Sequence, residues 1–259
     1  MKYFKSRLSV QILILLFLLA GTAFCADKDD RLFQLSTLNA LIEGVYDGNF
    51  SCGDLRSKGD FGIGTFNAVD GEMVMLDGSI YRIRSDGSVT RAAASDMTPF
   101  ALAVNFSPDI TLEPQSGINL KQLQEYIDFS LPTRNDIYAV KVTGTFEDIK
   151  LRSVPKQKKP YPKLTEVTKT QPVFELRKIE GTLVGFRFPD YMNGVNLPGY
   201  HFHFISSDRS HGGHVLDLTL GGSRIEIDTI RSYTLQLPAS AEFDRARINN
   251  NASAAKVEK

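Results

Sequence analysis

The chain has 259 residues and 30 basic and 30 acidic side chains, so its formal net charge is zero. This balance offers no excess positive charge for nucleic acid, and loss of Lys2, Lys5 and Arg7 with an N-terminal leader would make the mature protein slightly acidic. Only Cys52 of the two cysteines lies beyond that leader, so we expect no intramolecular disulfide and a fold stabilised by a packed core.

Residues 1–25 have the pattern of a secretory signal peptide. Basic residues precede an apolar run from Val10 to Ala20, and small residues follow it. The run is too short for a membrane anchor, which needs about 20 apolar residues, and Phe24 before Cys25 does not suit a lipoprotein signal. We therefore expect export to the periplasm or the medium, with no membrane attachment once the signal is cleaved.

The first half of the mature chain contains both helix and strand patterns. Leu32 to Val45 has apolar residues at helical spacing, with Ser36 or Thr37 as the N-cap, which predicts a helix. Residues 61–89 contain short β segments separated by three Asp-Gly pairs, which supply the positive φ of tight hairpin turns. We expect a β-meander there, followed by a strand at 98–105, a helix at 120–129 and a strand at 135–146.

A basic, proline-rich segment at 156–163 has the composition of a loop or linker, and strand patterns dominate after it. Many short strands with few helices favour an α+β fold built on mixed or antiparallel sheets. We expect two domains. An N-terminal α+β sheet domain would span 26–155, and a C-terminal β-rich metal-binding domain with a polar tail would span 156–259.

All four histidines lie in one stretch, from Gly199 to Leu218. In a strand, His201 and His203 share one face while the aromatic residues around them take the other. The polar stretch that follows ends in a double glycine, which indicates a turn, so His214 should return on the partner strand beside the same pair. His211 precedes the double glycine, and we expect it in a solvated loop.

Three converging imidazoles suit zinc, copper, iron or nickel. Three protein ligands with one open coordination position are typical of a catalytic metal site rather than a structural one. The alternative is that these are partly exposed strand histidines without a metal. Within the metal interpretation, a zinc hydrolase uses the same ligands because metal-bound hydroxide is available there, and a secreted metal-binding protein without chemistry is a further alternative.

Two other residues are ambiguous from spacing alone. Glu72 begins a predicted strand after a glycine, and a single glutamate on a strand is by default a surface carboxylate. Arg152 lies two residues from Lys150 and would share its strand face. A guanidinium can bind a carboxylate in a planar bidentate manner, but spacing alone favours a surface arginine in an ion pair.

Two ordered blocks of sequence go beyond these single residues. The first runs from Lys58 to Gly78 and contains Val-Asp-Gly-Glu-Met, and the second runs from Pro198 through Gly-Tyr-His-Phe-His-Phe to Gly-Gly-His-Val-Leu-Asp. These blocks resemble the α-acetolactate decarboxylase family. The resemblance implies a two-domain fold of mixed sheets, a homodimer, and zinc-dependent conversion of (S)-2-acetolactate into (R)-acetoin and CO₂.

The resemblance also implies roles for single residues. The family's metal ligands fall on His201, His203 and His214, its catalytic glutamate on Glu72, its active-site arginine on Arg152, and a further glutamate from the C-terminal tail on Glu258 as the nearest candidate. In the implied mechanism, CO₂ leaves an enediolate that zinc stabilises as a Lewis acid. Protonation on one face of the enediolate then gives a single acetoin enantiomer.

Overall fold

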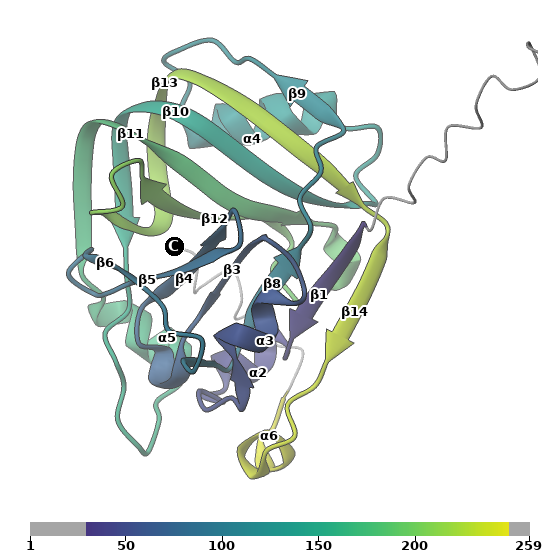
Figure 1. The fold of residues 1–259 in the computed structure, drawn as a ribbon, viewed down its shortest axis with the longest axis vertical. Coiled ribbons are helices and arrows are strands. Elements are labelled where there is room, and N and C mark those ends of the chain that lie inside the picture. The colour runs from purple at the N-terminus through teal and green to yellow at the C-terminus, as the bar shows by residue number, and fades with distance from the viewer. Residues whose placement is uncertain (1–29, 249–259) are drawn as a thin grey trace, which may run out of the picture.

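The computed structural model describes residues 30–248, in which two β-sheets pack face to face with short helices around them (Figure 1). In sheet order, the seven-stranded sheet consists of β14 (Ser232–Gln236), β1 (Arg31–Leu35), β8 (Ala101–Val104), β3 (Phe61–Thr65), β4 (Glu72–Leu76), β5 (Ser79–Ile83) and β6 (Val89–Arg91). The five-stranded sheet consists of β10 (Ile137–Arg152), β11 (Val173–Phe188), β12 (Gly199–Ser206), β13 (Gly212–Ile230) and β9 (Ile110–Leu112). A separate short ladder joins β2 (Phe50–Ser51) and β7 (Met97–Thr98).

Helices form a small part of the described chain. They are α2 (Leu38–Ile42), α3 (Cys52–Arg56), α4 (Leu120–Ser130), α5 (Leu164–Val167) and α6 (Ala241–Arg245), with the 3-10 turns η1 (Asn67–Val69), η2 (Thr168–Thr170) and η3 (Asp190–Met192). In Figure 1, α4 lies against the five-stranded sheet, and α2, α3 and α5 lie near the seven-stranded sheet. The expected α+β architecture with few helices is confirmed, and the parallel pairing of β1 with β14 makes the larger sheet mixed.

The two sheets do not divide at residue 155. β9 and β10 precede that position and belong to the five-stranded sheet, whereas β14 follows it and pairs with β1 in the seven-stranded sheet. β10 also pairs with β13, so β10, β11, β12 and β13 close into a small barrel. The segment at 156–163 therefore does not separate the two sheets, and each sheet draws strands from both sides of it.

The segment predicted as one helix from Leu32 to Val45 is a strand followed by a short helix. β1 is largely buried between β14 and β8, and a continuous apolar strand of this kind cannot be distinguished from a buried helix by periodicity. Ser36 adopts a left-handed φ of 63° just after β1. Thr37 then caps α2 by accepting a hydrogen bond from the amide of Ala40. The helix prediction is wrong for 32–36 and for 43–45, and of the two N-cap candidates Thr37 is confirmed and Ser36 is not.

Other local predictions agree with the structure. The meander at 61–89 is confirmed as β3, β4, β5 and β6, each antiparallel to the next. Asp77 and Gly78 have φ values of 50° and 70°, the two positive values that a type I′ hairpin turn requires. The predicted helix at 120–129 is α4, and the predicted strand at 135–146 is the first part of β10.

The alternation of side chains in β4 and β12 determines what lies between the sheets. Val74 packs against the five-stranded sheet, while Met73 packs on the opposite side with α3. In β12, Phe204 fills the barrel, while Ile205 packs against the seven-stranded sheet. The first residue of β4 shares the face of Val74 and the histidines of β12 share the face of Ile205, so these polar side chains face one another.

Gly185 on β11 leaves room for the neighbouring histidine strand. A Cβ atom at this position would overlap the carbonyl oxygen of His201 and the ring of Phe202. Gly185→Ala should therefore displace β12 and lower the free energy of unfolding by about 1–3 kcal/mol. Chemical denaturation measures this loss. Gly222→Ala is the control, because a Cβ there meets nothing within 4 Å, and equal unfolding midpoints for the two variants would contradict the prediction.

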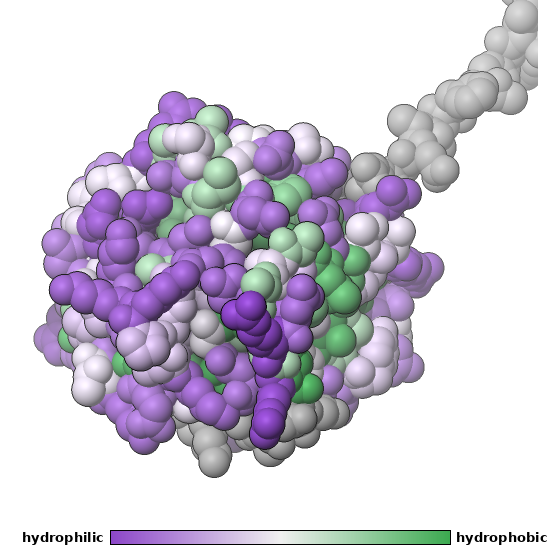
Figure 2. Space-filling view, turned by 90° about the horizontal axis from the view of Figure 1, so that it is seen from below, coloured by the Kyte–Doolittle hydropathy of each residue, from purple (hydrophilic) through white to green (hydrophobic). Residues whose placement is uncertain are grey.

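Residues 1–25, where the signal peptide is expected, lie outside the described residues, as does Glu258. Within residues 30–248 no helix is long and apolar enough to cross a membrane. Cys52, the first residue of α3, is buried in the core as a free thiol. Hydrophilic residues cover most of the face shown in Figure 2, and hydrophobic residues show between them in smaller areas.

Candidate metal centre

β12 and β13 bring three histidines together on the outer face of the small barrel. His203 and His214 are direct partners in the antiparallel pairing of the two strands, and His201 lies two residues before His203 on the same face. All three side chains are buried between the sheets. The predicted hairpin is therefore present, and His211 is exposed beside its turn, as expected.

The spacing of the imidazole nitrogens suits one shared metal ion. His201 Nε2 lies 3.2 Å from His203 Nε2 and 3.1 Å from His214 Nδ1. One nitrogen of each ring lies within 4.8 Å of the others. Nitrogen ligands at about 2.0–2.1 Å from a tetrahedral zinc ion are themselves about 3.3 Å apart. The three histidines can thus hold a metal such as zinc with little rearrangement.

The protonation of His203 also suits metal binding. Burial lowers the pKa of His203 to about 3, so its ring is neutral at physiological pH. His203 Nδ1 lies 2.8 Å from the carbonyl oxygen of Met73 on β4, which directs the proton to Nδ1. Nε2 therefore keeps its lone pair for a metal. The backbone of the opposite sheet orients this ring, as an outer-shell partner does in known metal sites.

Glu72 approaches the histidines from the opposite sheet. As the first residue of β4 it is buried, and its Oε2 lies 3.5 Å from His203 Nε2. Its strand neighbours are Thr65 on β3 and Ile83 on β5. Glu72 is therefore not a surface strand carboxylate, the default for a single glutamate. It is a buried group at the centre of the site.

Arg152 ends β10 directly opposite His214 and is buried. Its Nη1 donates a 2.8 Å hydrogen bond to Oε1 of Gln171. The expectation from spacing alone, a surface arginine on the face of Lys150, is wrong because Lys150 is exposed and Arg152 is not. The pairing of β10 with β13 shifts register between Lys150 and Leu151, and this irregularity breaks the simple alternation that the expectation assumed.

A pocket joins these groups. Glu72, Arg152, His201 and His203 line it together with an apolar wall of Leu38, Leu41, Val69, Phe100, Val154 and Leu164. The wall residues come from α2, α5 and the segments beside β4, β8 and β10. An apolar wall around a few polar groups is typical of a site for a small organic molecule. A substrate bound at these polar groups would therefore also contact apolar side chains.

Comparison with known proteins identifies the family. The sequence profile described as alpha-acetolactate decarboxylase matches residues 32–250. The chain belongs to this family. The alpha-acetolactate decarboxylase of Methanosarcina mazei is 46% identical over 225 residues, which cover 87% of this chain and 78% of that protein. That of Methylococcus capsulatus is 44% identical over 224 residues, which cover 86% of each chain.

The fold of this alpha-acetolactate decarboxylase family member also matches solved structures. A crystal structure of alpha-acetolactate decarboxylase from Bacillus subtilis strain 168 superposes with a TM-score of 0.86 at 40% identity, covering 88% of this chain and 97% of that one. A Staphylococcus aureus protein of unknown function, described as similar to alpha-acetolactate decarboxylase, superposes with a TM-score of 0.84 at 30% identity, covering 88% and 98%.

Sequence reasoning missed two kinds of residue in this family member's pocket. The first is the apolar wall, because the side chains of α2 have the same pattern whether they pack in a core or line a pocket. The second is Gln171, which lies in the loop before β11. No local pattern marks Gln171, since its relation to Arg152 exists only once β10 and β11 have paired.

Proposed function

We propose that the protein is a zinc-dependent decarboxylase that converts (S)-2-acetolactate into (R)-acetoin and CO₂. One observation carries the proposal. In a member of the alpha-acetolactate decarboxylase family, a cluster of three buried imidazoles lies at an apolar-walled pocket that two of them line together with a buried carboxylate and a buried guanidinium. The apolar wall suits the two methyl groups of acetolactate, and the polar groups suit its carboxylate, hydroxyl and ketone.

Arg152 provides the positive charge for the substrate. Its guanidinium binds the carboxylate or the hydroxyl of acetolactate and fixes the orientation of the bond that breaks. A zinc ion held by the three histidines would act as a Lewis acid toward the ketone and hydroxyl oxygens of the substrate. The bond between C2 and the carboxylate then breaks, its electron pair remains on the substrate as an enediolate, and CO₂ departs.

Glu72 delivers the proton to the enediolate. The enediolate needs one proton on carbon to become acetoin, and a carboxyl group fixed on one side of it delivers that proton to one face. The position of Glu72 beside His203, held by the strand pairing of β4, gives the proton donor a fixed direction. Facial selectivity of this kind supports a single acetoin enantiomer.

The first experiment measures acetoin formation from racemic acetolactate by the purified mature protein. Activity is followed before chelation, after chelation and after zinc is restored, with chiral analysis of the product. Loss on chelation, recovery with zinc and enantiopure (R)-acetoin are expected. Acetoin formation no faster than the spontaneous reaction, by protein that retains zinc, would overturn the proposal. Turnover of esters or lactones in its place would favour a three-histidine zinc hydrolase.

The contact between Arg152 and Gln171 gives a second test. In Gln171→Glu a carboxylate would lie within hydrogen-bond distance of the guanidinium and compete with the substrate carboxylate. We expect KM to rise about tenfold, the cost of one such competing interaction, with unchanged metal content. Steady-state kinetics and metal analysis measure both. Gln115→Glu, on an exposed loop, makes the same charge change as a control. An unchanged KM in Gln171→Glu would refute the competition.

Export, a homodimeric assembly and a role for Glu258 are further proposals. The N-terminal pattern of residues 1–25 supports export to the periplasm or medium, and family resemblance supports the other two. N-terminal sequencing of the secreted protein tests cleavage of the signal peptide. Light scattering of the purified protein tests the dimer. Glu258→Gln tests the tail, because loss of turnover is expected if its carboxylate reaches the pocket.

A further inference from the structure

The turn that leads into Glu72 has a strained backbone. Ala68 and Val69 have left-handed φ values of 61° and 45°, in a turn followed by the positive φ of Gly71. A left-handed conformation is rare for any residue other than glycine, and for a β-branched residue such as valine it is a genuine outlier. Such conformations persist only where the surrounding structure holds them, and they gather at functional sites. Val69 itself lines the pocket.

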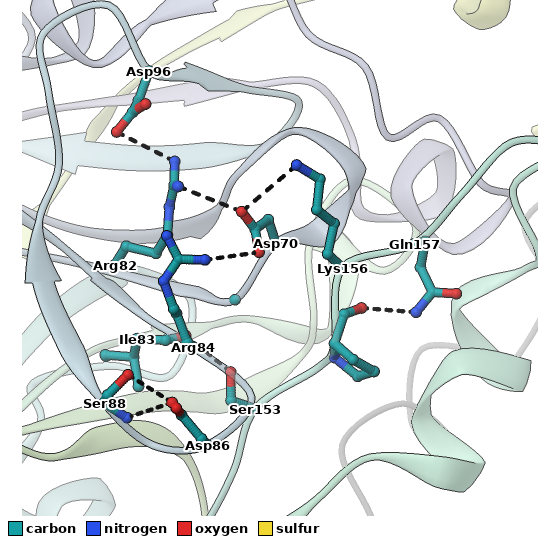
Figure 3. Close-up of polar contacts among 12 residues, drawn as sticks. Asp70, Arg82, Ile83, Arg84, Asp86, Ser88, Asp96, Ser153, Lys156 and Gln157 are labelled. Carbon is teal, nitrogen blue, oxygen red and sulfur yellow. Dashed lines mark hydrogen bonds and ion pairs between the residues drawn. The ribbon is translucent and has the colours of Figure 1, made fainter.

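Asp70 lies within this turn and gathers three basic side chains (Figure 3). Its Oδ2 lies 3.4 Å from Nη1 of Arg82 and 4.0 Å from Nζ of Lys156, and its Oδ1 lies 3.5 Å from Nη1 of Arg84. Isolated ion pairs on a surface contribute little. Here, however, three cations from two segments converge on one carboxylate whose side chain is only 15% exposed. Ion pairs from both segments therefore hold the Asp70 carboxylate in place.

Both segments belong to the active-site framework. Arg82 and Arg84 flank Ile83, the residue of β5 that pairs with Glu72. The hydroxyl of Ser153, the neighbour of Arg152, donates a 2.9 Å hydrogen bond to the carbonyl oxygen of Ile83 (Figure 3). The contacts of Asp70 therefore connect the strand that carries Glu72, its partner strand β5, and the segment that follows Arg152.

Backbone contacts complete the connection. The amide of Gln157, next to Lys156, donates a 2.8 Å hydrogen bond to the carbonyl oxygen of Ala68 inside the strained turn. The amide of Gly71 donates a 2.8 Å bond to the carbonyl of Val69, and Asp70, at the centre of this three-residue turn, has φ of −73° and ψ of 65°. A change at Asp70 is therefore transmitted directly to the residue before Glu72.

We propose that Asp70 is a positioning residue, whose ion pairs with Arg82, Arg84 and Lys156 hold the strained turn so that the Glu72 carboxylate is fixed beside His203. Asp70 does not touch the metal site or the substrate, and it acts through the backbone of the turn. The kinetic part of this inference rests on the proposed decarboxylase activity. Its structural part, the clamping of the turn, does not.

The test compares three variants with the wild-type protein. Asp70→Asn removes the charge and keeps the shape of the side chain. Arg84→Gln removes one partner that is 46% exposed, so the fold is not at risk. Asp96→Asn is the matched control: Asp96 also pairs with Arg82, at 3.2 Å, but lies outside the turn. Arg82 stacks on Phe66, 4.1 Å from its ring centroid, and this packing supports it in all three variants.

Two measurements are made on each variant. Amide hydrogen exchange of residues 66–72 measures how firmly the turn is held, independently of enzymatic activity. Steady-state kinetics with acetolactate separate kcat from KM. For Asp70→Asn we expect faster exchange in the turn. We also expect kcat to fall about 10- to 100-fold with little change in KM, because misplacing a proton donor by about 1 Å lowers the rate of the chemical step by a factor of this size. Arg84→Gln should show a smaller change of the same kind, and Asp96→Asn neither.

Each outcome is decisive. If Asp70→Asn does not fold, the same two measurements on Arg84→Gln test the positioning role instead. Unchanged exchange and kcat in the folded variants, or effects in Asp96→Asn as large as in Asp70→Asn, would overturn the positioning role. If the wild-type protein itself lacks decarboxylase activity, the proposed function fails. Selective acceleration of exchange in Asp70→Asn would still support the clamp in that case.

Discussion

Replacing His203 with alanine is expected to abolish retention of the metal and, with it, turnover. His203 lies next to both other histidines: its Nε2 lies 3.2 Å from His201 Nε2, and its strand position is directly opposite His214. Two remaining imidazoles leave a metal with too few protein ligands for a stable three-ligand site. The substitution also removes the contact between His203 Nδ1 and the carbonyl oxygen of Met73, which links the two sheets.

Metal analysis after dialysis measures the first part of this prediction, and acetoin formation measures the second. We expect metal content near zero in His203→Ala and activity at the spontaneous background. His211→Ala is the matched control, because His211 lies on the same hairpin but is exposed, with its Nδ1 2.7 Å from the hydroxyl of Ser210. Retention of a full equivalent of metal by His203→Ala would show that the three-histidine site is wrongly assigned.

The histidine site was largely predictable because it is local in sequence. Alternation along one strand places His201 and His203 on one face, and a single turn returns His214 to them. Both steps depend on neighbours fewer than 20 residues apart. The meander before Glu72 was predictable for the same reason, since each Asp-Gly pair specifies its own turn.

The rest of the site depends on contacts between distant parts of the chain. Arg152 reaches the pocket only because β10 pairs irregularly with β13, and no pattern around residue 152 encodes that irregularity. Gln171 has a partner only once β10 and β11 have formed. The apolar wall from α2 is identical in pattern to an ordinary core. Residue types near one another in sequence therefore revealed the candidate metal ligands, whereas the charged and apolar surroundings required the tertiary structure or a family resemblance.

The strand at 31–35 illustrates the same limit at the level of the fold. Its apolar residues suit a helix or a strand, and pairing with β14, some 200 residues later, decides between them. The expected boundary at 155 relied in the same way on local composition. The pairings that join β9 and β10 to the later strands are not visible in composition. Long-range strand pairing overrides local propensity in both cases.

Glu72→Gln is expected to keep the metal and to lose turnover by about 10²- to 10⁴-fold, the usual contribution of a positioned proton donor or acceptor. Glutamine has nearly the shape of glutamate, so the packing of β4 between β3 and β5 should be retained. In the proposed mechanism, the amide cannot exchange a proton with the enediolate. The three imidazoles are unchanged by the substitution, and they continue to hold the ion.

Metal analysis and single-turnover kinetics separate these two effects, and chiral analysis of the residual acetoin adds a third reading. If Glu72 delivers the proton to one face, the slow residual reaction should lose enantiomeric purity, because water then protonates both faces. Glu180→Gln, at an exposed position of β11, is the control and should behave as the wild type. Near-full activity with intact enantiomeric purity in Glu72→Gln would assign the proton step to another group, while loss of metal would assign Glu72 to the coordination sphere.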